Sequence, residues 1–444
     1  MLRGIFMQVS VENTSAIARR MTIELPGALV QSELGKRLKN AVSHAKMNGF
    51  RPGKVSKATE KRYQSSILQD IMWEKFEQAL KDQNIAPAGQ PVAFEPSEFV
   101  QGKDFSFVVD FDVMPPEIEV VDHSDIEIIR PEHELTEADI EEMITALRKQ
   151  ASTFKEVDKA AQEGDRVIID FVGKLDGESF EGGTAKEQAL ELGSKQMIPG
   201  FEDALIGIKK DEERTFKVTF PADYHAENLA GKEVEFTVKV TKVEEIELAP
   251  IDNELFKRYG MVDGDEPKFV AEVRKNMERE LRQAIKSKIK NQVFAALLKK
   301  YDCDLPRVWI NSEASSLRDQ SINQMNSQYG MKLNPQDFPF DRFKEKAKNR
   351  ILLGLIVRKI IDKNELKVDE QRVNAMIEEI ASVYEEPQEV IKQLNEDKKG
   401  LEGIRSVVLE DQVVDLLLSQ IKVTNEAMVY QDAVKPNEKM HLDI

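Results

Sequence analysis

The spacing of apolar residues changes along this chain, and its first part alternates strand and helix spacings. The clearest strand pattern is the strict alternation of Phe105, Phe107, Val109, Phe111 and Val113 with mostly polar partners. Shorter patterns of this kind occupy 8–11 and 21–25. Apolar residues three or four positions apart mark two helices between these strands, around 34–45 and 63–80. Residues 1–116 are therefore predicted to form an N-terminal α+β domain.

The next segment, 117–153, is predicted to be a linker that contains one helix. Two prolines, Pro115 and Pro116, precede it, and Ile126 and Ile128 form a short extended run. A helix is expected from about Glu137, because Thr136 can cap its N-terminus.

Glycine and strand spacing dominate the third segment, 154–248. Three alternating apolar triplets or quartets predict strands, at 167–171, 216–220 and 234–240. The run Pro199–Ile208 is expected to form one short helix. The segment is predicted to be a compact, mainly antiparallel β domain.

From residue 249 to 432 the pattern becomes almost wholly helical. One apolar stripe from Phe269 to Leu298 predicts a single helix of about 30 residues, near 45 Å long. Further helices are expected at 307–328, 341–364, 368–384, 388–396 and 401–420. Helices this long and this charged predict extended arms with partly exposed apolar faces. Residues 433–444 are expected to be a disordered tail.

Composition indicates a globular cytoplasmic protein. The 444 residues are 41% hydrophobic and 32% charged, and no apolar run is long enough to cross a membrane. The single cysteine, Cys303, excludes an internal disulfide framework. Met1–Met7 is too short and too weakly apolar for a secretory signal. The five histidines lack metal-ligand spacing, so no metal is expected.

One short stretch reverses the acidic character of the chain. The protein carries a formal net charge of −17, yet nine basic residues and only one acidic residue lie between Lys36 and Arg62. Within this stretch Phe50, Arg51 and Lys54 stand beside Gly49 and Gly53, which permit a tight turn. An exposed aromatic residue is unfavourable in water unless it is bound. This loop is predicted to dock onto a large anionic partner, although most charge runs are ordinary solvated surface.

Four blocks of the third segment resemble the FKBP-type prolyl isomerases in order and spacing. They are Asp170–Glu181, Leu192–Leu205 with its Met-Ile-Pro-Gly-Phe-Glu core, Tyr224-His225 and Val234–Phe236. The resemblance implies a proline pocket formed by Phe171, Phe180, Ile198, Phe201, Tyr224 and Phe236. Phe201 stands where most single-domain members have Trp. The plainer alternative is that these side chains are simply the core of a small β domain.

The whole layout, from Met7 to about Thr424, resembles the bacterial trigger factor family. The family's ribosome-binding signature, Gly-Phe-Arg-x-Gly-Lys-x-Pro, matches Gly49, Phe50, Arg51, Gly53 and Lys54. Ser56 occupies the final proline position, which predicts a looser end of the loop, and Pro52 takes the variable position. The resemblance implies binding to an exit-tunnel protein and rRNA of the large ribosomal subunit, and to nascent and unfolded polypeptides.

The resemblance also implies prolyl isomerase activity without a cofactor. The chain has no phosphate-binding Gly-Lys-Ser/Thr loop, which favours ATP independence. Two alternatives stay open: a ribosome-independent isomerase and holdase that grips folded or free partners, and a scaffold whose FKBP-like domain has lost turnover. No membrane contact is expected. A homodimer of the free protein is compatible with unoccupied apolar arms.

Overall fold

The computed structural model describes residues 7–44, 55–175, 177–222, 224, 226, 229–261, 264–330, 333–334, 336, 338–384 and 386–436. The chain divides into two units. One is formed by 1–131, 285–427 and 435–444, and the other by 132–284 and 428–434.

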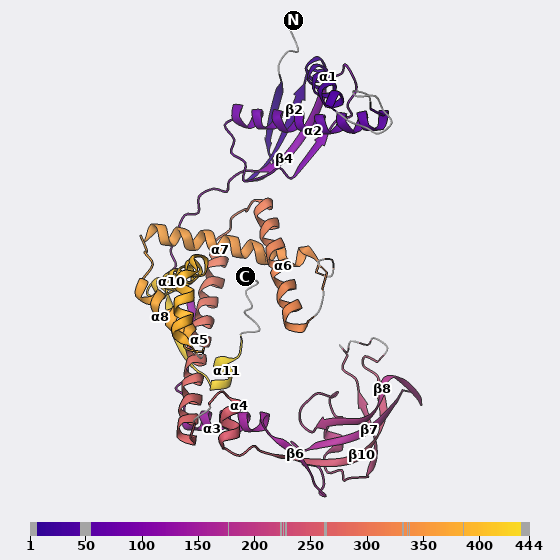
Figure 1. The fold of residues 1–444 in the computed structure, drawn as a ribbon, viewed down its shortest axis with the longest axis vertical. Helices are drawn as coiled ribbons and strands as arrows, with labels where there is room; N and C mark the ends of the chain where they lie inside the picture. The colour runs from indigo at the N-terminus through magenta and orange to yellow at the C-terminus, as the bar shows by residue number, and fades with distance from the viewer. Residues whose placement is uncertain are drawn as a thin grey trace. The chain divides into compact units, whose positions relative to one another are not determined.

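The first unit begins with a four-stranded antiparallel sheet in the order β1-β2-β4-β3. Its strands are β1 (Gln8–Asn13), β2 (Ala18–Leu25), β3 (Ala93–Pro96) and β4 (Phe105–Asp112). Helices α1 (Gly27–His44) and α2 (Lys57–Asp82) lie against this sheet (Figure 1). The α+β prediction for this part of the chain is confirmed.

The alternating phenylalanines of β4 explain how this sheet is held to its helices. Phe105, Phe107 and Phe111 are at most 2% exposed and share one apolar cluster with α1 and α2. Fully burying such side chains contributes about 1.5–3 kcal/mol each. Strand β3 was not predicted, because it is a four-residue edge strand that ends in Pro96 and has no alternating pattern.

The helices of the C-terminal region follow the predicted ranges within a few residues. They are α5 (Glu266–Lys300), α6 (Arg307–Tyr329), α7 (Lys344–Lys363), α8 (Glu370–Ala381), α9 (Pro387–Glu396) and α10 (Lys398–Leu418), with a 3-10 turn at Phe340–Phe343 before α7. Helix α5 is 35 residues long. None of the helices within the described ranges combines the length and apolar character that a membrane crossing needs.

Residues 117–131, expected to be part of a linker, are built into the core of the first unit. Ile126 and Ile128 are 6% and 2% exposed and belong to the same apolar cluster as Val293, Leu297 and Ile356. Strand β5 (Glu127–Glu132) pairs with β11 (Lys422–Ala427), so the region expected to be almost wholly helical also contains a strand. Alternation of Ile126 and Ile128 predicted the extended run. Its pairing was not predicted, because the partner strand β11 is far away in the sequence.

The second unit contains a five-stranded sheet in the order β6-β10-β7-β8, with β9 also paired to β10. Its strands are β6 (Thr153–Glu156), β7 (Arg166–Leu175), β8 (Glu178–Glu191), β9 (Glu213–Thr219) and β10 (Glu233–Glu247). All pairings are antiparallel, as predicted. The helices of this unit include α3 (Glu137–Gln150) and α4 (Asn253–Arg258). Thr136 caps α3 through a reciprocal capping box with Asp139.

Two predictions in this unit need correction. The helix expected over Pro199–Ile208 is only a 3-10 turn at Asp203–Leu205, because Gly200 and Gly207 take positive φ values of 87° and 83° and end regular helix on both sides. The tail expected to be disordered from residue 433 begins with helix α11 (Tyr430–Val434), in which Ala433 is fully buried. Residues 437–444 lie outside the described part of the chain.

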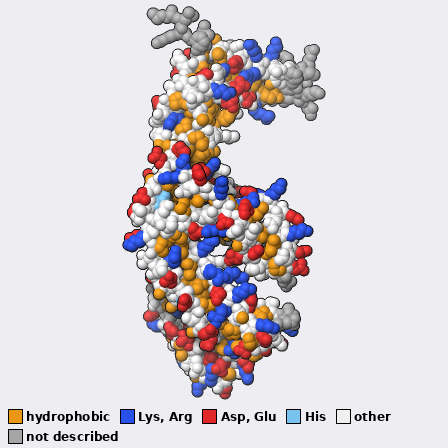
Figure 2. Space-filling view, turned by 90° about the vertical axis from the view of Figure 1, so that its left-hand side faces the viewer, with side chains coloured by type: hydrophobic (Ala, Val, Ile, Leu, Met, Phe, Trp, Pro, Cys, Tyr) orange, Lys and Arg blue, Asp and Glu red, His pale blue; other side chains and the backbone are white. Residues whose placement is uncertain are grey.

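Acidic and basic side chains are interspersed with hydrophobic ones over the face drawn in Figure 2. Among the exposed large hydrophobic residues are Trp73, Val383 and Tyr384, at 40%, 59% and 55% exposed. Scattered apolar exposure of this kind is ordinary on protein surfaces.

Candidate functional site

The second unit brings all six predicted pocket residues into one apolar cluster. They come from five separate parts of the domain: strand β7, strand β8, strand β10 and the two loops that precede the 3-10 turn and follow β9. The six are Phe171, Phe180, Ile198, Phe201, Tyr224 and Phe236. Only the tertiary fold places them together, since they span 66 positions of sequence.

Phe236 lies at the centre of the aromatic contacts. Its ring centroid is 5.1 Å from that of Phe201, 6.0 Å from Phe171 and 6.3 Å from Phe180. All three pairs meet edge to face, the geometry that the ring quadrupoles favour. Rings packed in this way present positive edges and negative faces to one another at fixed angles.

Burial divides the six residues into a floor and a rim. Phe201, Phe171 and Phe236 are 1%, 9% and 4% exposed, so they form the floor and also belong to the domain core. Phe180, Ile198 and Tyr224 are half-buried. The alternative that these side chains are simply the core of a small β domain therefore describes the three floor residues well. The three half-buried side chains, in contrast, leave apolar surface that a ligand can reach.

Two further aromatic residues complete the cluster and were missed as pocket residues. Phe216 lies 5.3 Å from Phe201, and Phe220 lies 4.7 Å from Tyr224 and 6.2 Å from Phe180, all measured between ring centroids. The alternation at 216–220 predicted strand β9, which carries Phe216 and ends one residue before Phe220. It could not show that both rings point to the same side as the motif residues of other strands.

Two glycines leave the space that the Phe180 ring occupies. A Cβ atom at Gly183 would lie 2.7 Å from Phe180 Cζ, and one at Gly173 would lie 2.9 Å from Phe180 Cε1 and 2.6 Å from Phe236 Cε1. Real Cβ contacts are essentially never this short. Both positions therefore need glycine because the aromatic rings approach the backbone closely.

The loop before Ile198 is held by one buried carboxylate. Glu202 is 7% exposed, and its oxygens accept hydrogen bonds from the backbone N–H groups of Gly193, Lys195 and Met197 at 2.9, 3.0 and 3.0 Å. Burial acts to raise the pKa of Glu202, but these backbone donors outweigh it and hold the pKa below its ordinary value. Glu202 is thus a positioning residue for the loop that leads to Ile198.

The Glu202→Gln variant is expected to loosen residues 193–197. The amide is neutral and accepts through only one oxygen, so all three N–H groups lose a charged partner and at least one loses its acceptor, at a cost of about 1–3 kcal/mol. The pKa of Glu202 is lower in the folded than in the unfolded chain, so its stabilisation is present above the ordinary pKa of 4.5 and is lost as the pH falls through the folded value.

Hydrogen–deuterium exchange of residues 193–197 measures this effect, after correction for the intrinsic exchange rate at each pH. The wild-type protein should lose protection in this loop at acidic pH, and Glu202→Gln should show little protection at any pH. The exposed neighbour Asp203, changed to Asn, serves as the control. Equal protection in Glu202→Gln and the control would show that the carboxylate does not hold the loop.

The backbone N–H of Ile198 is a donor at the edge of the aromatic cluster. Within the described ranges it is paired with no acceptor, while the Ile198 carbonyl accepts from the N–H of Phe201 at 3.1 Å. A half-buried donor beside an aromatic floor is suited to hold the carbonyl oxygen of a bound peptide.

The predicted ribosome-binding residues lie outside the described part of the chain. Gly49, Phe50, Arg51, Gly53 and Lys54 all fall within 45–54. The structure describes both flanks, where α1 ends at His44 and α2 begins at Lys57. Thus the expectation that two helices flank the basic loop is confirmed.

Ser56 contributes a helix cap at the end of this loop. Its Oγ accepts a hydrogen bond from the Thr59 N–H at 3.2 Å and makes it the N-cap of α2. A serine cap stabilises a helix by about 1 kcal/mol. The predicted loosening concerns residues outside the described part of the chain, whereas on the helix side Ser56 has a stabilising local role.

One of the nine basic residues in this stretch is already paired. Arg37 on α1 donates two hydrogen bonds to Glu74 on α2, at 2.9 and 2.6 Å. This bidentate pair holds the two helices together and raises the pKa of Arg37. Lys36 and Lys39 are exposed and have no carboxylate partner in the ranges that the structure describes.

Three family profiles match consecutive parts of the chain. The profile described as "Bacterial trigger factor protein (TF)" matches residues 7–147, and the one for the "Bacterial trigger factor protein (TF) C-terminus" matches 268–419. Between them, residues 157–241 match the profile of the "FKBP-type peptidyl-prolyl cis-trans isomerase". The third match contains all six pocket residues.

Curated relatives match over nearly the full length. The trigger factor of Stutzerimonas stutzeri (strain A1501) is 46% identical over 437 residues, which are 97% of this chain and 99% of the relative. That of Alcanivorax borkumensis is 45% identical over 438 residues, 98% of this chain and 99% of the relative. A solved structure of the trigger factor chaperone covers 93% of this chain and 99% of its own, at 18% identity and a TM-score of 0.36, too weak a likeness to support an argument. The profiles and the curated relatives show that this chain belongs to the trigger factor family.

Proposed function

We propose that this chain is an ATP-independent, ribosome-associated chaperone that binds nascent polypeptides and catalyses cis–trans isomerisation of X–Pro bonds. The observation that carries the enzymatic part is the aromatic cup, in which six motif residues from five parts of the domain share one cluster and three rings pack against Phe236. Full-length similarity to trigger factors supports the chaperone part.

The chemistry that the cup has to perform is rotation about a partly double bond. The barrier to this rotation is about 18–20 kcal/mol, because the amide is conjugated in its planar forms. The twisted form has less charge separation, so an apolar site that excludes water favours it over the planar amide. We propose that the proline ring sits on Phe171, Phe201 and Phe236 and that no covalent intermediate forms.

Two donors are proposed to hold the substrate backbone while the bond rotates. The Ile198 N–H would donate to one substrate carbonyl, and the Tyr224 hydroxyl would donate to another. Because Phe220 packs against Tyr224 with ring centroids 4.7 Å apart, the phenol ring is held in one orientation. The Glu202 contacts fix the loop that ends at Ile198.

We propose that the division of labour follows five segments: 1–116 for ribosome binding, 117–153 as a connection with a helix, 154–248 for isomerisation, 249–432 for substrate cradling, and 433–444 as a tail. The last strand of the N-terminal sheet, β4, ends at Asp112, which supports the first boundary. Strand β6 begins at Thr153, one residue ahead of the third segment.

The residues of the basic loop lead us to propose specific ribosomal partners. Phe50 would enter a hydrophobic recess of an exit-tunnel protein, and Arg51 and Lys54 would pair with acidic side chains or rRNA phosphates. We propose a cytoplasmic location, as the single Cys303 is suited to a reducing compartment. Free protein would form a homodimer that covers apolar helix surface.

A proline-limited refolding assay tests the isomerase mechanism. Tyr224→Phe removes only the proposed donor, and the net worth of one hydrogen bond, about 0.5–1.5 kcal/mol, predicts a loss of about 2- to 12-fold in the catalysed rate. The suppression of client aggregation should not change.

Tyr384→Phe is the matched control for Tyr224→Phe, since it removes a phenol hydroxyl from an exposed helix-region side chain. It should leave the rate at the wild-type value. Equal rates for wild type and Phe201→Ala would instead support a scaffold that has lost turnover.

A further inference from the structure

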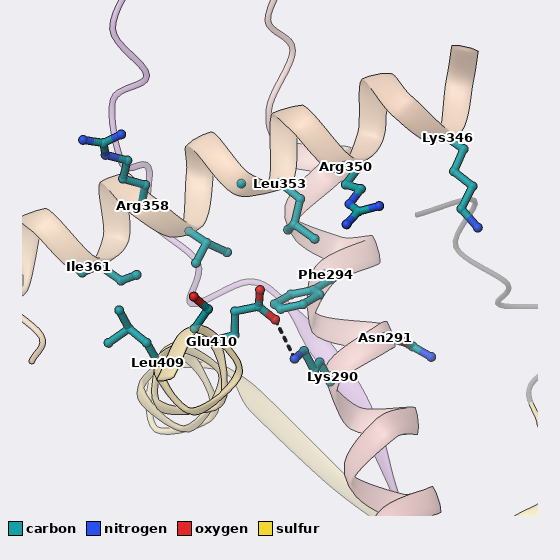
Figure 3. Close-up of a pocket in the computed structure, with 13 residues that line it drawn as sticks. Lys290, Asn291, Phe294, Lys346, Arg350, Leu353, Arg358, Ile361, Leu409 and Glu410 are labelled. Carbon is teal, nitrogen blue, oxygen red and sulfur yellow. Dashed lines mark hydrogen bonds and ion pairs between the residues drawn. The ribbon is translucent and has the colours of Figure 1, made fainter. Parts of the chain in front are cut away.

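A cavity lies among three helices of the first unit, which does not contain the aromatic cup. Helices α5, α7 and α10 enclose a volume of about 670 Å³. Figure 3 shows α7 running across one side, with side chains of α5 and α10 closing the others. The volume falls in the range of about 300–1,000 Å³ that small-molecule sites occupy.

The floor of this cavity is apolar. Phe294 of α5 and Leu353 and Val357 of α7 are 5%, 7% and 7% exposed, so each presents one face to the cavity while the rest packs in the core. Ile361 and Leu409 add half-buried aliphatic surface. An aliphatic or aromatic ligand body placed here would be removed from water at a gain of about 25 cal/mol per Å².

Gly354 leaves this floor open. It stands in the interior of α7, where glycine is less favourable than alanine. A Cβ atom there would meet nothing within 4 Å. Packing therefore does not require glycine at this position, and the missing side chain leaves space in the lining of the cavity.

The cavity lining carries a surplus of positive charge on a protein whose net charge is −17. Four cations and one carboxylate line it: Lys290, Lys346, Arg350, Arg358 and Glu410. Lys290 is neutralised by Glu410 at 2.7 Å, as the dashed line in Figure 3 shows. Lys346 and Arg358 have no carboxylate partner within the described ranges.

Two of these cations are placed to act together. Lys346 and Arg350 are four residues apart on α7 and extend to the same side of the helix in Figure 3. Arg350 also contacts Glu313 of α6 at 3.2 Å, but its side chain is 48% exposed, and such pairs contribute little. A carboxylate or phosphate near both would receive charge-assisted hydrogen bonds from each.

We propose that this cavity binds a small amphipathic anion, namely an unbranched fatty carboxylate or alkyl phosphate. Its apolar chain lies on Phe294, Leu353 and Val357, and its anionic head lies between Lys346 and Arg350. The cavity is lined by three helices and has Lys346 and Arg350 on one side of α7, which favours a small ligand with one charged end over a neutral one.

Calorimetric titration of the full chain tests the proposal with four probes below their micelle-forming concentrations. These are decanoate, decyl phosphate, decanol and inorganic phosphate. We expect saturable one-to-one binding of at least one of the two amphipathic anions, and at least tenfold weaker binding of decanol and inorganic phosphate. The comparison of decanoate with decyl phosphate distinguishes a carboxylate source from a phosphate source. No saturable binding of either, or equal binding of decanol, would overturn the proposal.

Two variants test whether the ligand binds in this cavity. Gly354→Met fills the space that the missing side chain leaves in the cavity lining. It should weaken binding at least tenfold without loss of helix content by circular dichroism. Gly403→Met on α10 is the matched control, because a Cβ there also meets nothing within 4 Å and the residue does not line the cavity. Unchanged affinity in Gly354→Met would show that the anion binds elsewhere.

The charge of the head group is tested separately. Lys346→Gln combined with Arg350→Gln should lower the affinity for the anions to that for decanol, while binding of decanol stays the same. If the anions bind this double variant as tightly as the wild type, the cations do not recognise the head group and the assignment fails.

Discussion

Replacing Phe50, Arg51 and Lys54 together by alanine is expected to remove the protein from ribosome pellets. These residues match the ribosome-binding signature of the family to which the chain belongs, and they lie in a stretch with nine basic residues and one acidic residue. Aromatic and arginine anchors at interfaces typically cost 2 kcal/mol or more each when truncated. A combined loss of about 4 kcal/mol is about a thousandfold in affinity.

The matched control separates the loop from the general basicity of its surroundings. Lys36→Ala with Lys39→Ala removes two exposed cations, the same change in net charge, but leaves Phe50 in place. This control should keep most of the binding at physiological salt and weaken it at higher salt, where screening reduces long-range attraction. Wild-type pelleting of the triple variant would support the ribosome-independent isomerase instead.

An isomerase assay on the triple variant, made alongside the ribosome pelleting, distinguishes the two activities. The loop and the aromatic cup are in different units of the chain, and the nearest cup residue, Phe171, comes 117 positions after Lys54. The triple variant should therefore catalyse X–Pro isomerisation at the wild-type rate. Loss of both activities would mean that the substitutions had disturbed the fold.

Local signals in the sequence predicted much of the fold. Alternation at Phe105 to Phe111 defined β4, and the same residues form the buried face of the sheet. The Thr136 cap fixed the start of α3, because a side-chain hydroxyl three residues before an acidic residue satisfies the first free N–H groups. These signals work because each depends only on residues close together in the chain.

Pairings between distant residues were not predictable in this way. Nothing in residues 126–128 identifies β11 as their partner almost 300 positions later. Gly173 and Gly183 could be recognised as glycines in strands but not as the space for Phe180. The motif resemblance named six pocket residues correctly as neighbours, yet Phe216 and Phe220 carried no signal beyond strand alternation.

The glycines of the cup give the second large expected effect: Gly173→Ala should reduce the isomerase rate by about a hundredfold. The new Cβ would lie 2.6 Å from Phe236 Cε1 and 2.9 Å from Phe180 Cε1. Phe236 is 4% exposed and cannot move away freely, so the rings that form floor and rim must shift. Overpacking costs about 1–3 kcal/mol in stability, and a misplacement of about 1 Å in a site can cost about a hundredfold in rate.

A graded set of variants makes this prediction specific. Gly183→Ala presses only on the half-buried Phe180 ring, so its loss of rate should be smaller than that of Gly173→Ala. Lys174→Ala and Thr184→Ala are the controls, because each is an exposed neighbour of one glycine. The measurement is kcat/KM on an X–Pro peptide, with circular dichroism and ribosome pelleting to verify folding. Because Gly173→Ala changes no polar group, a wild-type rate in this variant would mean that the ring positions do not determine catalysis, and the cup would then be core alone.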